Sequence, residues 1–558
     1  MKHIIVSLII AISIFSANAQ RSIPQQASID SIFSSWDSSD SPGGTVGIIK
    51  EGKLVFAKGY GSANLDYNIP NKTKTVYRIG STSKQFTAAC IVLLSQQGKL
   101  ALEDKLIKFF PDFPAYANDI TIQHLLNHTS GIRDYLILAR LSGLGSEDHY
   151  TDKTVEKWLT NQKELNFNPG DEYLYSNSGY WLLGQIVKSV SGITMAEYAK
   201  ENIFIPLEMN ATHFHNDHKQ IVKNRASGYR PNRKGGYSIS MTTLDMIGDG
   251  GIFTTVEDLA KWDTSFYGSK ILNQSFWKKM THVGTLNNGK KITYASGLDI
   301  STYKGLKIIQ HGGSFVGYKA DIIRFPEAQF SVVILANRAD SNPTKMAYKV
   351  ADLFLKNEYK NGNTIKAKQT NSKENSLKSI TLTKKELQAF EGAYWSTKNK
   401  TSRKLEVRND TLNYVRGNGR ATQMFPISKN KFQMIGPRIP VVLEVNSTAK
   451  AKEFTVKSPS AALLKFVAYT PLTSYSASDL ETYSGDYYCA ELDVVYTLNT
   501  KKEGIMLFVK GNPAGELKQV MKDLLSLNSR QTFDFNETRD MFRLSMLGRV
   551  KNLKFVKR

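Results

Sequence analysis

The sequence predicts an α+β protein of several domains, with helices and strands mixed in its first part and strands dominating its last part. Three observations carry this prediction. The apolar run at 86–94 contains few helix breakers and has the length of a buried helix. The segments 306–310 and 320–325 have the composition of strands. Beyond residue 381 the chain changes to short alternating segments such as 404–408 and 411–415, which are typical of small antiparallel β-domains.

The first element along the chain has the pattern of a secretory signal. A short basic start is followed by an apolar run at residues 4–15, and Ala17-Asn18-Ala19 has the small-x-small form of a cleavage site. The apolar run is too short to span a bilayer. We therefore expect a signal peptide at 1–19, a mature chain from about Gln20, and a periplasmic or secreted protein.

Ser81-Thr82-Ser83-Lys84 stands at the start of the expected helix. Lys84 follows Ser81 by three residues, so the two side chains share one helix face, one turn apart. A serine hydroxyl is a weak nucleophile at neutral pH, and a buried amine that has lost its proton can accept the hydroxyl proton. Ser-x-x-Lys at a helix start is the sequence pattern of that pairing. Because a single match arises easily by chance, the prediction depends on further motifs.

Two further motifs follow, each in the sequence context that this chemistry needs. Tyr175-Ser176-Asn177 comes after a turn-rich approach and precedes a second helical stretch at 180–187. His311-Gly312-Gly313-Ser314 stands between the two strand-like segments. The two glycines would let a substrate backbone lie directly against a sheet edge. Together the three motifs indicate a nucleophilic active site.

These motifs resemble those of the serine β-lactamase and penicillin-binding-protein superfamily, in the branch of class C β-lactamases, DD-peptidases, D-aminopeptidases and related esterases. The resemblance covers residues 30–350 or so, and stretches at 121–131, 167–170 and 248–255 support it. It implies a β-lactamase-type catalytic domain, with an antiparallel sheet flanked by helices and a helical subdomain, and Ser81 at their junction. His128 is expected to shape a turn rather than to act as a base.

The resemblance implies a role for each matching residue. Ser81 is the expected nucleophile that forms an acyl-enzyme. Lys84 accepts its proton or holds Tyr175 as a phenolate, and Tyr175 relays the proton to the leaving group. Asn177 is expected to hold the substrate amide and to orient Lys84. A phenol with a pKa near ~10 can serve at pH 7 only if adjacent cations, here Lys84 and His311, lower that pKa. The sequence leaves open which of Lys84 and Tyr175 is the base of acylation.

The third motif departs from that of true β-lactamases, and the departure bears on the substrate. Enzymes of this branch usually carry Lys-Thr-Gly where this chain has His311-Gly312-Gly313. A lysine is a permanent cation for the substrate carboxylate, whereas a histidine is neutral or cationic depending on pH, so its hold is weaker and switchable. The motif is more similar to that of DD-peptidases, D-aminopeptidases and some esterases. His311, Gly313 and Ser314 are expected to bind the substrate, with the backbone N–H groups of Ser81 and Ser314 as the oxyanion hole.

The predicted function is that of a secreted serine hydrolase which cleaves a peptide or amide bond, as D-aminopeptidases and DD-carboxypeptidases do. The alternatives are a carboxylesterase for small acyl esters, a β-lactamase, and a non-catalytic protein that binds wall fragments. We expect no cofactor and no metal. His213, His215 and His218 could gather around zinc, but a polar surface loop is the simpler interpretation. Cys90 and Cys489 are expected to be small buried residues rather than a disulfide or a metal site.

The chain of 558 residues is too long for a single core. A polar stretch near residue 370 has the composition of a linker. The pattern Leu-x-x-aromatic-x-Gly-x-Tyr occurs at 387–394 and again at 480–487. This repeat predicts two small barrel-like β-domains, a layout that looks like that of D-aminopeptidases. The expected parts are a catalytic domain at 20–360, a linker at 361–380, and β-domains at 381–472 and 473–558.

The net charge of +23 is concentrated in the β-domains and at the end of the chain. Such basic accessory domains would be attracted to an anionic cell-envelope surface. Nucleic acid is not an expected partner, because no binding motif is present; the expected substrate is a small molecule or a short peptide. A high pI that simply keeps the protein soluble is the alternative. Residues at the basic end of the chain are Arg549, Lys551, Lys554, Lys557 and Arg558.

Overall fold

The computed structural model describes residues 23–359 and most of 380–558. The expected signal peptide lies outside the described residues, as does the expected linker except for its last residue. In the described part of the chain, no helix is both long and apolar enough to cross a membrane. The short undescribed segments within the β-domains are 417–418, 436–440, 448–451, 458–462, 472–475, 502–503 and 529.

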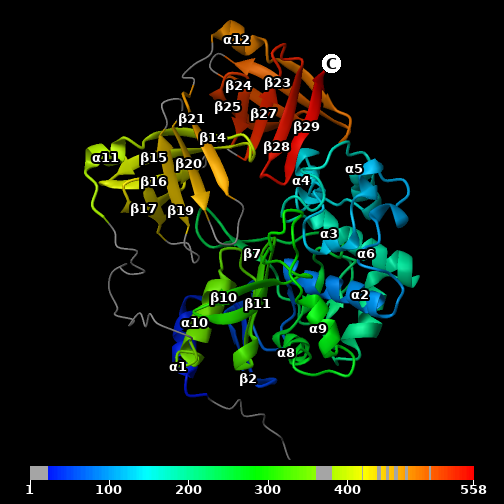
Figure 1. The fold of residues 1–558 in the computed structure, drawn as a ribbon. Helices are drawn as coiled ribbons and strands as arrows, with labels where there is room; N and C mark the ends of the chain where they lie inside the picture. The colour runs from blue at the N-terminus through cyan, green and yellow to red at the C-terminus, as the bar shows by residue number, and fades with distance from the viewer. Residues whose placement is uncertain are drawn as a thin grey trace, which may run out of the picture.

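A six-stranded antiparallel sheet forms the centre of the first domain (Figure 1). In sheet order its strands are β10 (Asp299–Tyr303), β11 (Leu306–Phe315), β12 (Tyr318–Phe325), β13 (Phe330–Ala336), β1 (Gly44–Lys50) and β2 (Lys53–Tyr60). Strand β1, from the start of the domain, thus pairs with β13, from its end. Both are buried along almost their whole length, because helices cover both faces of the sheet.

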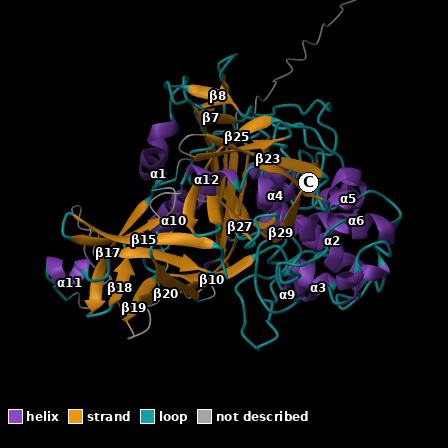
Figure 2. Cartoon of the chain, turned by 90° about the horizontal axis from the view of Figure 1, so that it is seen from above, coloured by secondary structure: helices purple, strands orange, loops and turns teal. Residues whose placement is uncertain are grey.

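Two groups of helices cover the sheet. On one face, α1 (Gln26–Phe33) and α10 (Pro343–Phe354) pack together. On the other face, α8 (Val256–Thr264) contacts β1, β2 and β13 and leads to a helical subdomain. Figure 2 shows the subdomain gathered on one side of the molecule. Its helices are α2 (Lys84–Gln96), α3 (Ile122–Leu126), α4 (Tyr135–Leu141), α5 (Asp152–Thr160), α6 (Asn177–Ser191), α7 (Met195–Ala199) and α9 (Gln274–Met280).

Short strands complete the first domain as two- and three-stranded sheets. They are β3 (Ser62–Asn64), β4 (Ile69–Pro70), β5 (Tyr77–Arg78), β6 (His213–Phe214), β7 (Tyr229–Pro231), β8 (Tyr237–Ile239) and β9 (Ile252–Thr254). Strand β9 lies between β5 and β6. Because β5 leads directly into the Ser81 motif, this small sheet fixes the entry to that motif.

Helix α2 confirms the expected buried helix. Every side chain from Lys84 to Leu94 is buried, because the helix runs between the sheet and α6 and has no face in solvent. The Trp262 ring of α8 packs 4.4 Å from that of Phe86, and its Nε1 donates a 2.6 Å hydrogen bond to Gln85 Oε1. These contacts hold the first turn of α2 against the face of the sheet.

The last part of the chain forms two closed barrels of eight strands each, which confirms the predicted fold class. The first consists of β14 (Gly392–Ser396), β15 (Thr401–Arg408), β16 (Thr411–Arg416), β17 (Ala421–Ser428), β18 (Lys431–Met434), β19 (Val442–Ser447), β20 (Lys452–Lys457) and β21 (Leu464–Tyr469). The second consists of β22 (Gly485–Cys489), β23 (Val494–Lys501), β24 (Gly504–Val509), β25 (Asn512–Met521), β26 (Leu524–Leu527), β27 (Gln531–Phe535), β28 (Met541–Met546) and β29 (Val550–Lys557).

The sequence repeat builds the same start in each barrel. A short helix, α11 (Lys384–Gln388) or α12 (Ala477–Glu481), precedes the first strand. The repeated tyrosine then points back to the helix, since Tyr394 donates to the carbonyl of Phe390 at 2.8 Å and Tyr487 to that of Tyr483 at 3.0 Å. Both tyrosines are fully buried. The repeat therefore encodes a helix that is fastened to its barrel by a buried phenol.

The second barrel is docked on the helical subdomain through a buried arginine. Arg133 Nη1 donates to Glu491 Oε2 at 2.7 Å and to Gln162 Oε1 at 2.8 Å, while its Nη2 donates to the carbonyl of Lys551 at 2.9 Å. The side chains of Arg133 and Glu491 are 0% and 8% exposed. The hydroxyl of Tyr496 adds a bond to the carbonyl of Leu141 at 2.8 Å. This contact places the turn between β28 and β29 next to the Ser81 motif.

Replacing Glu491 with alanine is expected to destabilise the protein by about 3–5 kcal/mol, because Arg133 would stay buried without its carboxylate. The midpoint of thermal unfolding measures the effect. Glu516→Ala, an exposed carboxylate of the same barrel, is the matched control and should leave the midpoint unchanged. Equal midpoints for both variants would show that this ion pair does not hold the barrel in place.

Candidate active site

Ser81 lies in a 3₁₀ turn, Gly80–Ser83, that leads into α2. The helix proper begins at Lys84, so Ser81 precedes it by one turn rather than being its first residue. Gly80 has a φ of +52°, and a Cβ there would lie 2.9 Å from the backbone nitrogen of Ser314. A glycine is therefore needed for the turn to press against β11. The turn brings the first motif beside the third.

Lys84 is fully buried and contacts the first two motifs at once. Its Nζ donates to Ser81 Oγ at 3.3 Å, to Asn177 Oδ1 at 2.9 Å and to the carbonyl of Asp249 at 2.5 Å. Burial lowers the pKa of Lys84 to about 8, although the carboxylates of Asp249 and Asp134 oppose the shift. A sizeable fraction of neutral amine therefore exists near physiological pH. With two N–H groups held by Asn177 and Asp249, the lone pair of that amine faces Ser81.

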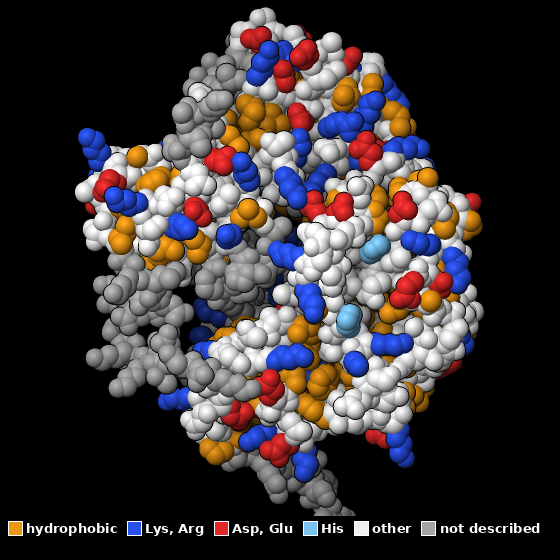
Figure 3. Space-filling view, viewed as in Figure 1, with side chains coloured by type: hydrophobic (Ala, Val, Ile, Leu, Met, Phe, Trp, Pro, Cys, Tyr) orange, Lys and Arg blue, Asp and Glu red, His pale blue; other side chains and the backbone are white. Residues whose placement is uncertain are grey.

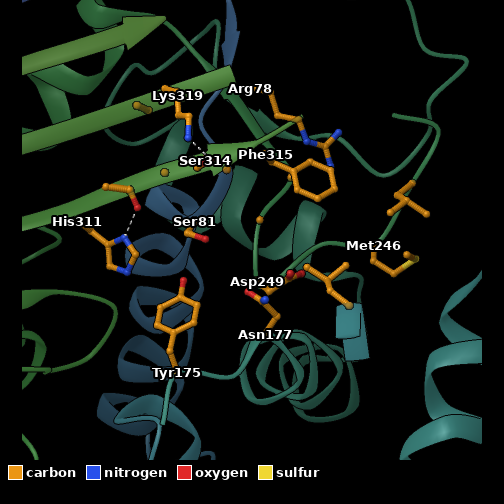
Figure 4. Close-up of a pocket in the computed structure, with 18 of the residues that line it drawn as sticks. Arg78, Ser81, Tyr175, Asn177, Met246, Asp249, His311, Ser314, Phe315 and Lys319 are labelled. Carbon is orange, nitrogen blue, oxygen red and sulfur yellow. Dashed lines mark hydrogen bonds between the residues drawn. The ribbon is translucent and has the colours of Figure 1, made fainter. Parts of the chain in front are cut away.

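Tyr175 lies on the other side of Ser81, with its hydroxyl pointing toward the serine (Figure 4). The phenol oxygen is buried and makes no hydrogen bond with the described residues. Its ring packs 4.2 Å from that of His128, and Lys84 Nζ lies 4.9 Å from its centroid. Burial raises the pKa of Tyr175, and the nearby Ser81 hydroxyl and Arg549 guanidinium offset only part of the rise. The expectation of a lowered pKa was wrong, so the resting phenol keeps its proton.

Asn177 begins α6 and is held by a carboxylate that the sequence motifs did not include. Its backbone N and its Nδ2 both donate to Asp134 Oδ2 at 2.9 Å. The other oxygen of Asp134 caps α4, accepting from the backbone nitrogens of Leu136 and Ile137. Asp134 thereby fixes the amide whose Oδ1 holds Lys84. A cap residue before a helix was the only sequence signal that could have pointed to Asp134.

His128 packs against the ring of Tyr175 and supports the segment that leads into α6. It has a φ of +58°, and its Nδ1 accepts a hydrogen bond from the backbone nitrogen of Ser176 at 3.2 Å. Burial and the nearby cations hold its pKa well below the ordinary value, so the imidazole is neutral. His128 is therefore a buried turn residue that packs under the Tyr175 ring.

The third motif lies within β11 rather than in a turn. Strand β10 begins opposite Gln310, so the motif extends past this pairing, and its free edge faces the 3₁₀ turn of Ser81. A Cβ on Gly313 would lie 1.8 Å from the carbonyl oxygen of Ile79. Gly313 is thus required by the packing of the protein itself, not by a substrate backbone. The Thr82 hydroxyl bonds to the carbonyl of His311 at 3.1 Å and fastens the turn to the strand.

His311 is buried and engaged on both nitrogens. Nε2 lies 2.8 Å from the hydroxyl of Tyr294, and Nδ1 lies 2.8 Å from the carbonyl of Gly312. A carbonyl can only accept, so Nδ1 carries the proton and Nε2 accepts from Tyr294. Burial, with the charge of Lys84, lowers the pKa of His311 to about 3. His311 is therefore neutral throughout the physiological range, and the expected pH-switchable hold on a carboxylate was wrong.

A turn of the second barrel enters the site. The Arg549 guanidinium lies 5.1 Å from the centroid of the Tyr175 ring and 3.7 Å from Asp134 Oδ2. Its carbonyl accepts from Asn166 Nδ2 at 2.8 Å and from the backbone nitrogen of Asp134 at 3.2 Å. The sequence showed Arg549 only as one member of a basic end. No local pattern could have placed it here, because its position depends on how the barrel docks.

A pocket of about 640 Å³ opens above these groups. Figure 4 shows Ser81 between Tyr175 and Ser314, with His311 to one side and Asn177 and Asp249 to the other. The pocket's only lining carboxylate among the described residues is that of Asp249, which accepts from the Tyr135 hydroxyl. Its cationic lining residues are Arg78, Arg140, Lys319 and Arg549. The pocket is therefore suited to an anionic ligand.

One group in the described part of the chain has ligand atoms close enough together to hold a metal ion. Its members, with ligand atoms within 4.8 Å of one another, are His149, His218 and Asp245. The histidine cluster considered from the sequence is split, since His213 and His215 pack instead against the ring of Phe253. None of these side chains lines the pocket above Ser81.

Several known proteins are similar to this chain in sequence or in fold. The beta-lactamase family model matches residues 30–354. The chain is 30% identical to a penicillin-binding protein from Bacillus subtilis (strain 168), over 54% of this chain and 70% of that protein. It is 26% identical to a D-aminopeptidase from Brucella anthropi, over 56% of this chain and 59% of that enzyme. The fold of the octameric penicillin-binding protein homologue from Pyrococcus abyssi is similar, with a TM-score of 0.55 and 24% identity, over 79% of this chain and 98% of that one.

Proposed function

The chain belongs to the beta-lactamase family, and we propose that it is a serine hydrolase which cleaves a peptide or amide bond close to a substrate carboxylate, in the manner of a DD-carboxypeptidase. Ser81 is the nucleophile and Lys84 its base. The relatives named penicillin-binding protein and D-aminopeptidase support hydrolase chemistry. The observation that carries the choice of substrate is the Arg549 guanidinium beside Tyr175.

The proposed reaction begins with transfer of the Ser81 proton to the neutral Lys84 amine. The Ser81 oxygen then forms a bond to the substrate carbonyl carbon, and the backbone N–H groups of Ser81 and Ser314 stabilise the negative oxygen. The carbon–nitrogen bond breaks as the proton passes from Lys84 through the protonated phenol of Tyr175 to the leaving amine. Water then hydrolyses the acyl-enzyme and restores Ser81. The lowered pKa of Lys84 and the raised pKa of Tyr175 both support this order.

Charge in the pocket favours a carboxylate over an ammonium group in the substrate. An aminopeptidase must hold a free amine near the cleaved bond, and here that amine would approach Arg549 and Lys319. A carboxypeptidase substrate offers a carboxylate, which a guanidinium can bind through two parallel hydrogen bonds. Neutral His311 cannot supply this charge. Arg549 is therefore proposed to do so.

The site of action is proposed to be the periplasm or the outside of the cell. The basic start, apolar run and small-x-small pattern within residues 1–19 support this proposal. Cell-wall peptides with D-residues occur in that compartment and carry free carboxylates. A peptide of this kind is the proposed substrate.

The test compares a peptide ending in D-Ala-D-Ala, a D-alanyl p-nitroanilide with a free amine, and a neutral short-chain ester. We expect the first to have the highest kcat/KM. Arg549→Gln should raise KM for the D-Ala-D-Ala peptide about 10–100-fold, because a charge-assisted hydrogen bond contributes about 1.5–3 kcal/mol. The ratio of kcat/KM for the peptide to that for the ester should fall by the same factor.

Arg549→Lys keeps the positive charge and is the matched variant, which should recover part of the lost affinity. Preference of the wild type for the free-amine substrate would instead favour a D-aminopeptidase. A peptide-to-ester ratio that is the same in the wild type and in Arg549→Gln would contradict the role proposed for this arginine.

A further inference from the structure

A second cavity, of about 830 Å³, lies where the first domain and the two barrels meet. The segments that line it include the loop at 286–293 of the first domain, the hairpin at 398–403 of the first barrel and the turn at 547–551 of the second barrel. Leu547 lines both this cavity and the Ser81 pocket. The two hollows are therefore neighbours that share one wall.

The carboxylates that line this cavity are already engaged. Asp171 Oδ1 accepts a hydrogen bond from Asn287 Nδ2 at 2.8 Å. Glu172 Oε1 lies 2.9 Å from the Nζ of Lys398 on the opposite domain. These are the acidic side chains of the cavity lining among the described residues. Glu172 is thus paired with Lys398, and Asp171 leaves a single negative charge beside the other lining cations.

Cationic side chains from all three domains remain around the cavity. Figure 3 shows Lys and Arg side chains gathered about the hollow between the barrels and the first domain. Among the described residues, six of the lining cations have no carboxylate within ion-pair distance. They are Lys290, Lys291, Arg403, Arg416, Arg530 and Lys551.

Of these cations, Arg403 is held in place by hydrogen bonds, and Lys551 is partly buried. Arg403 is fixed by hydrogen bonds from Nε to the Tyr414 hydroxyl at 2.7 Å and from Nη1 to Thr401 Oγ1 at 2.7 Å. Burial lowers the pKa of Lys551; the Glu172 carboxylate opposes this shift, and Lys398 adds a smaller repulsion. Charges gathered without partners repel one another, and a bound anion would relieve that repulsion. The arrangement is thus a preformed site for a ligand with several negative charges.

We propose that this cavity binds the anionic portion of an extended substrate, a peptide that carries several carboxylates and whose cleaved bond lies at Ser81. Leu547 lines both hollows, so they lie next to each other, and an extended chain bound at Ser81 would be long enough to reach the second hollow. The six cations come from three walls, so they match charges spread along a chain better than a single anion. This inference rests on the proposed function for the identity of the cleaved bond, but the binding itself can be measured without turnover.

Binding is measured with the full chain carrying Ser81→Ala, which cannot consume a ligand. The probe is a rhodamine-labelled peptide of six glutamates, and fluorescence anisotropy reports its Kd. Lys291→Glu in the first domain and Arg416→Glu in the first barrel should each weaken binding about tenfold. The matched control is Lys457→Glu, the same charge change at an exposed end of β20 outside the cavity; it should leave Kd unchanged. Thermal unfolding checks that each variant is folded.

Equal weakening by Lys457→Glu would show attraction to the whole basic surface and would overturn the proposal. If a polyphosphate of the same charge binds more tightly than the glutamate peptide, the proposal that the ligand is a peptide would be wrong. Hydrolysis separates this inference from the proposed function. A wild type that binds the glutamate peptide but cleaves no D-Ala-D-Ala peptide contradicts the proposed function alone. If the wild type cleaves a short peptide, but lengthening that peptide with glutamates does not raise kcat/KM, the result contradicts only the role proposed for the second cavity.

Discussion

Replacing Ser81 with alanine is expected to lower kcat/KM on the order of 10⁴-fold or more, and to abolish covalent labelling by a fluorophosphonate. The serine oxygen is the atom that both Lys84 and Tyr175 face, and alanine leaves those groups without a nucleophile. Removal of one small hydroxyl from a half-buried position leaves the fold intact. Intact-protein mass spectrometry after exposure to the substrate should show an acyl adduct in the wild type and none in the variant.

The matched control is Ser83→Ala, which removes a hydroxyl from the same 3₁₀ turn. The Ser83 oxygen accepts a hydrogen bond from the backbone nitrogen of Ile252 at 3.1 Å and is not among the hydrogen-bond partners of Lys84 Nζ in the described structure. Its loss should cost about 1 kcal/mol of stability and leave labelling in place. An adduct that persists in Ser81→Ala would mean that another residue is the nucleophile, and the proposed reaction at Ser81 would be wrong.

Sequence reasoning was most effective where the chemistry depends on short spacing. Ser81 and Lys84 are three residues apart, so any helical turn brings their side chains together. In the Tyr-x-Asn motif the two residues are also close in the chain, since Asn177 begins α6 and Tyr175 precedes it by two residues. The repeated Leu-x-x-aromatic-x-Gly-x-Tyr pattern predicted two barrels because each copy encodes the same short helix and first strand at the start of a barrel.

The ionisation states could not be predicted in the same way. The phenol oxygen of Tyr175 and the side chain of His311 are both buried. Burial raises the pKa of the tyrosine and lowers that of the histidine, so both groups stay neutral. A sequence shows neighbouring charges along the chain but not the depth of a side chain in the folded protein. The sequence-based expectation therefore gave weight to nearby cations and none to desolvation, which is the larger effect for both residues.

The residues that sequence analysis did not identify contact the site from positions far away in the sequence. Asp134 forms a hydrogen bond with Asn177, the carbonyl of Asp249 with Lys84, and Tyr294 with His311. Arg549 belongs to another domain, and its place beside Tyr175 follows from the docking of Arg133 on the second barrel. Such contacts depend on how elements pack, so the sequence alone had no pattern that predicts them.

Replacing Lys84 with methionine is expected to lower kcat/KM about 10²–10⁴-fold, the usual contribution of a general base. Methionine fills a similar volume and cannot accept a proton. Tyr175→Phe is the matched variant, since it removes the other candidate base. Because the Tyr175 phenol is protonated at rest, its loss should slow proton delivery to the leaving group while the pH profile of acylation stays that of Lys84.

The pH dependence of acylation decides between the two bases. The pKa of Lys84 is lowered to about 8, so its neutral form grows as pH rises. The rate of acylation should therefore rise through about pH 8 and level off above it, both in the wild type and in Tyr175→Phe. The carboxylate of Asp249 favours the charged form of Lys84, so Asp249→Asn should move the inflection to lower pH. An inflection that disappears in Tyr175→Phe, or that stays fixed in Asp249→Asn, would assign the base to a group other than Lys84.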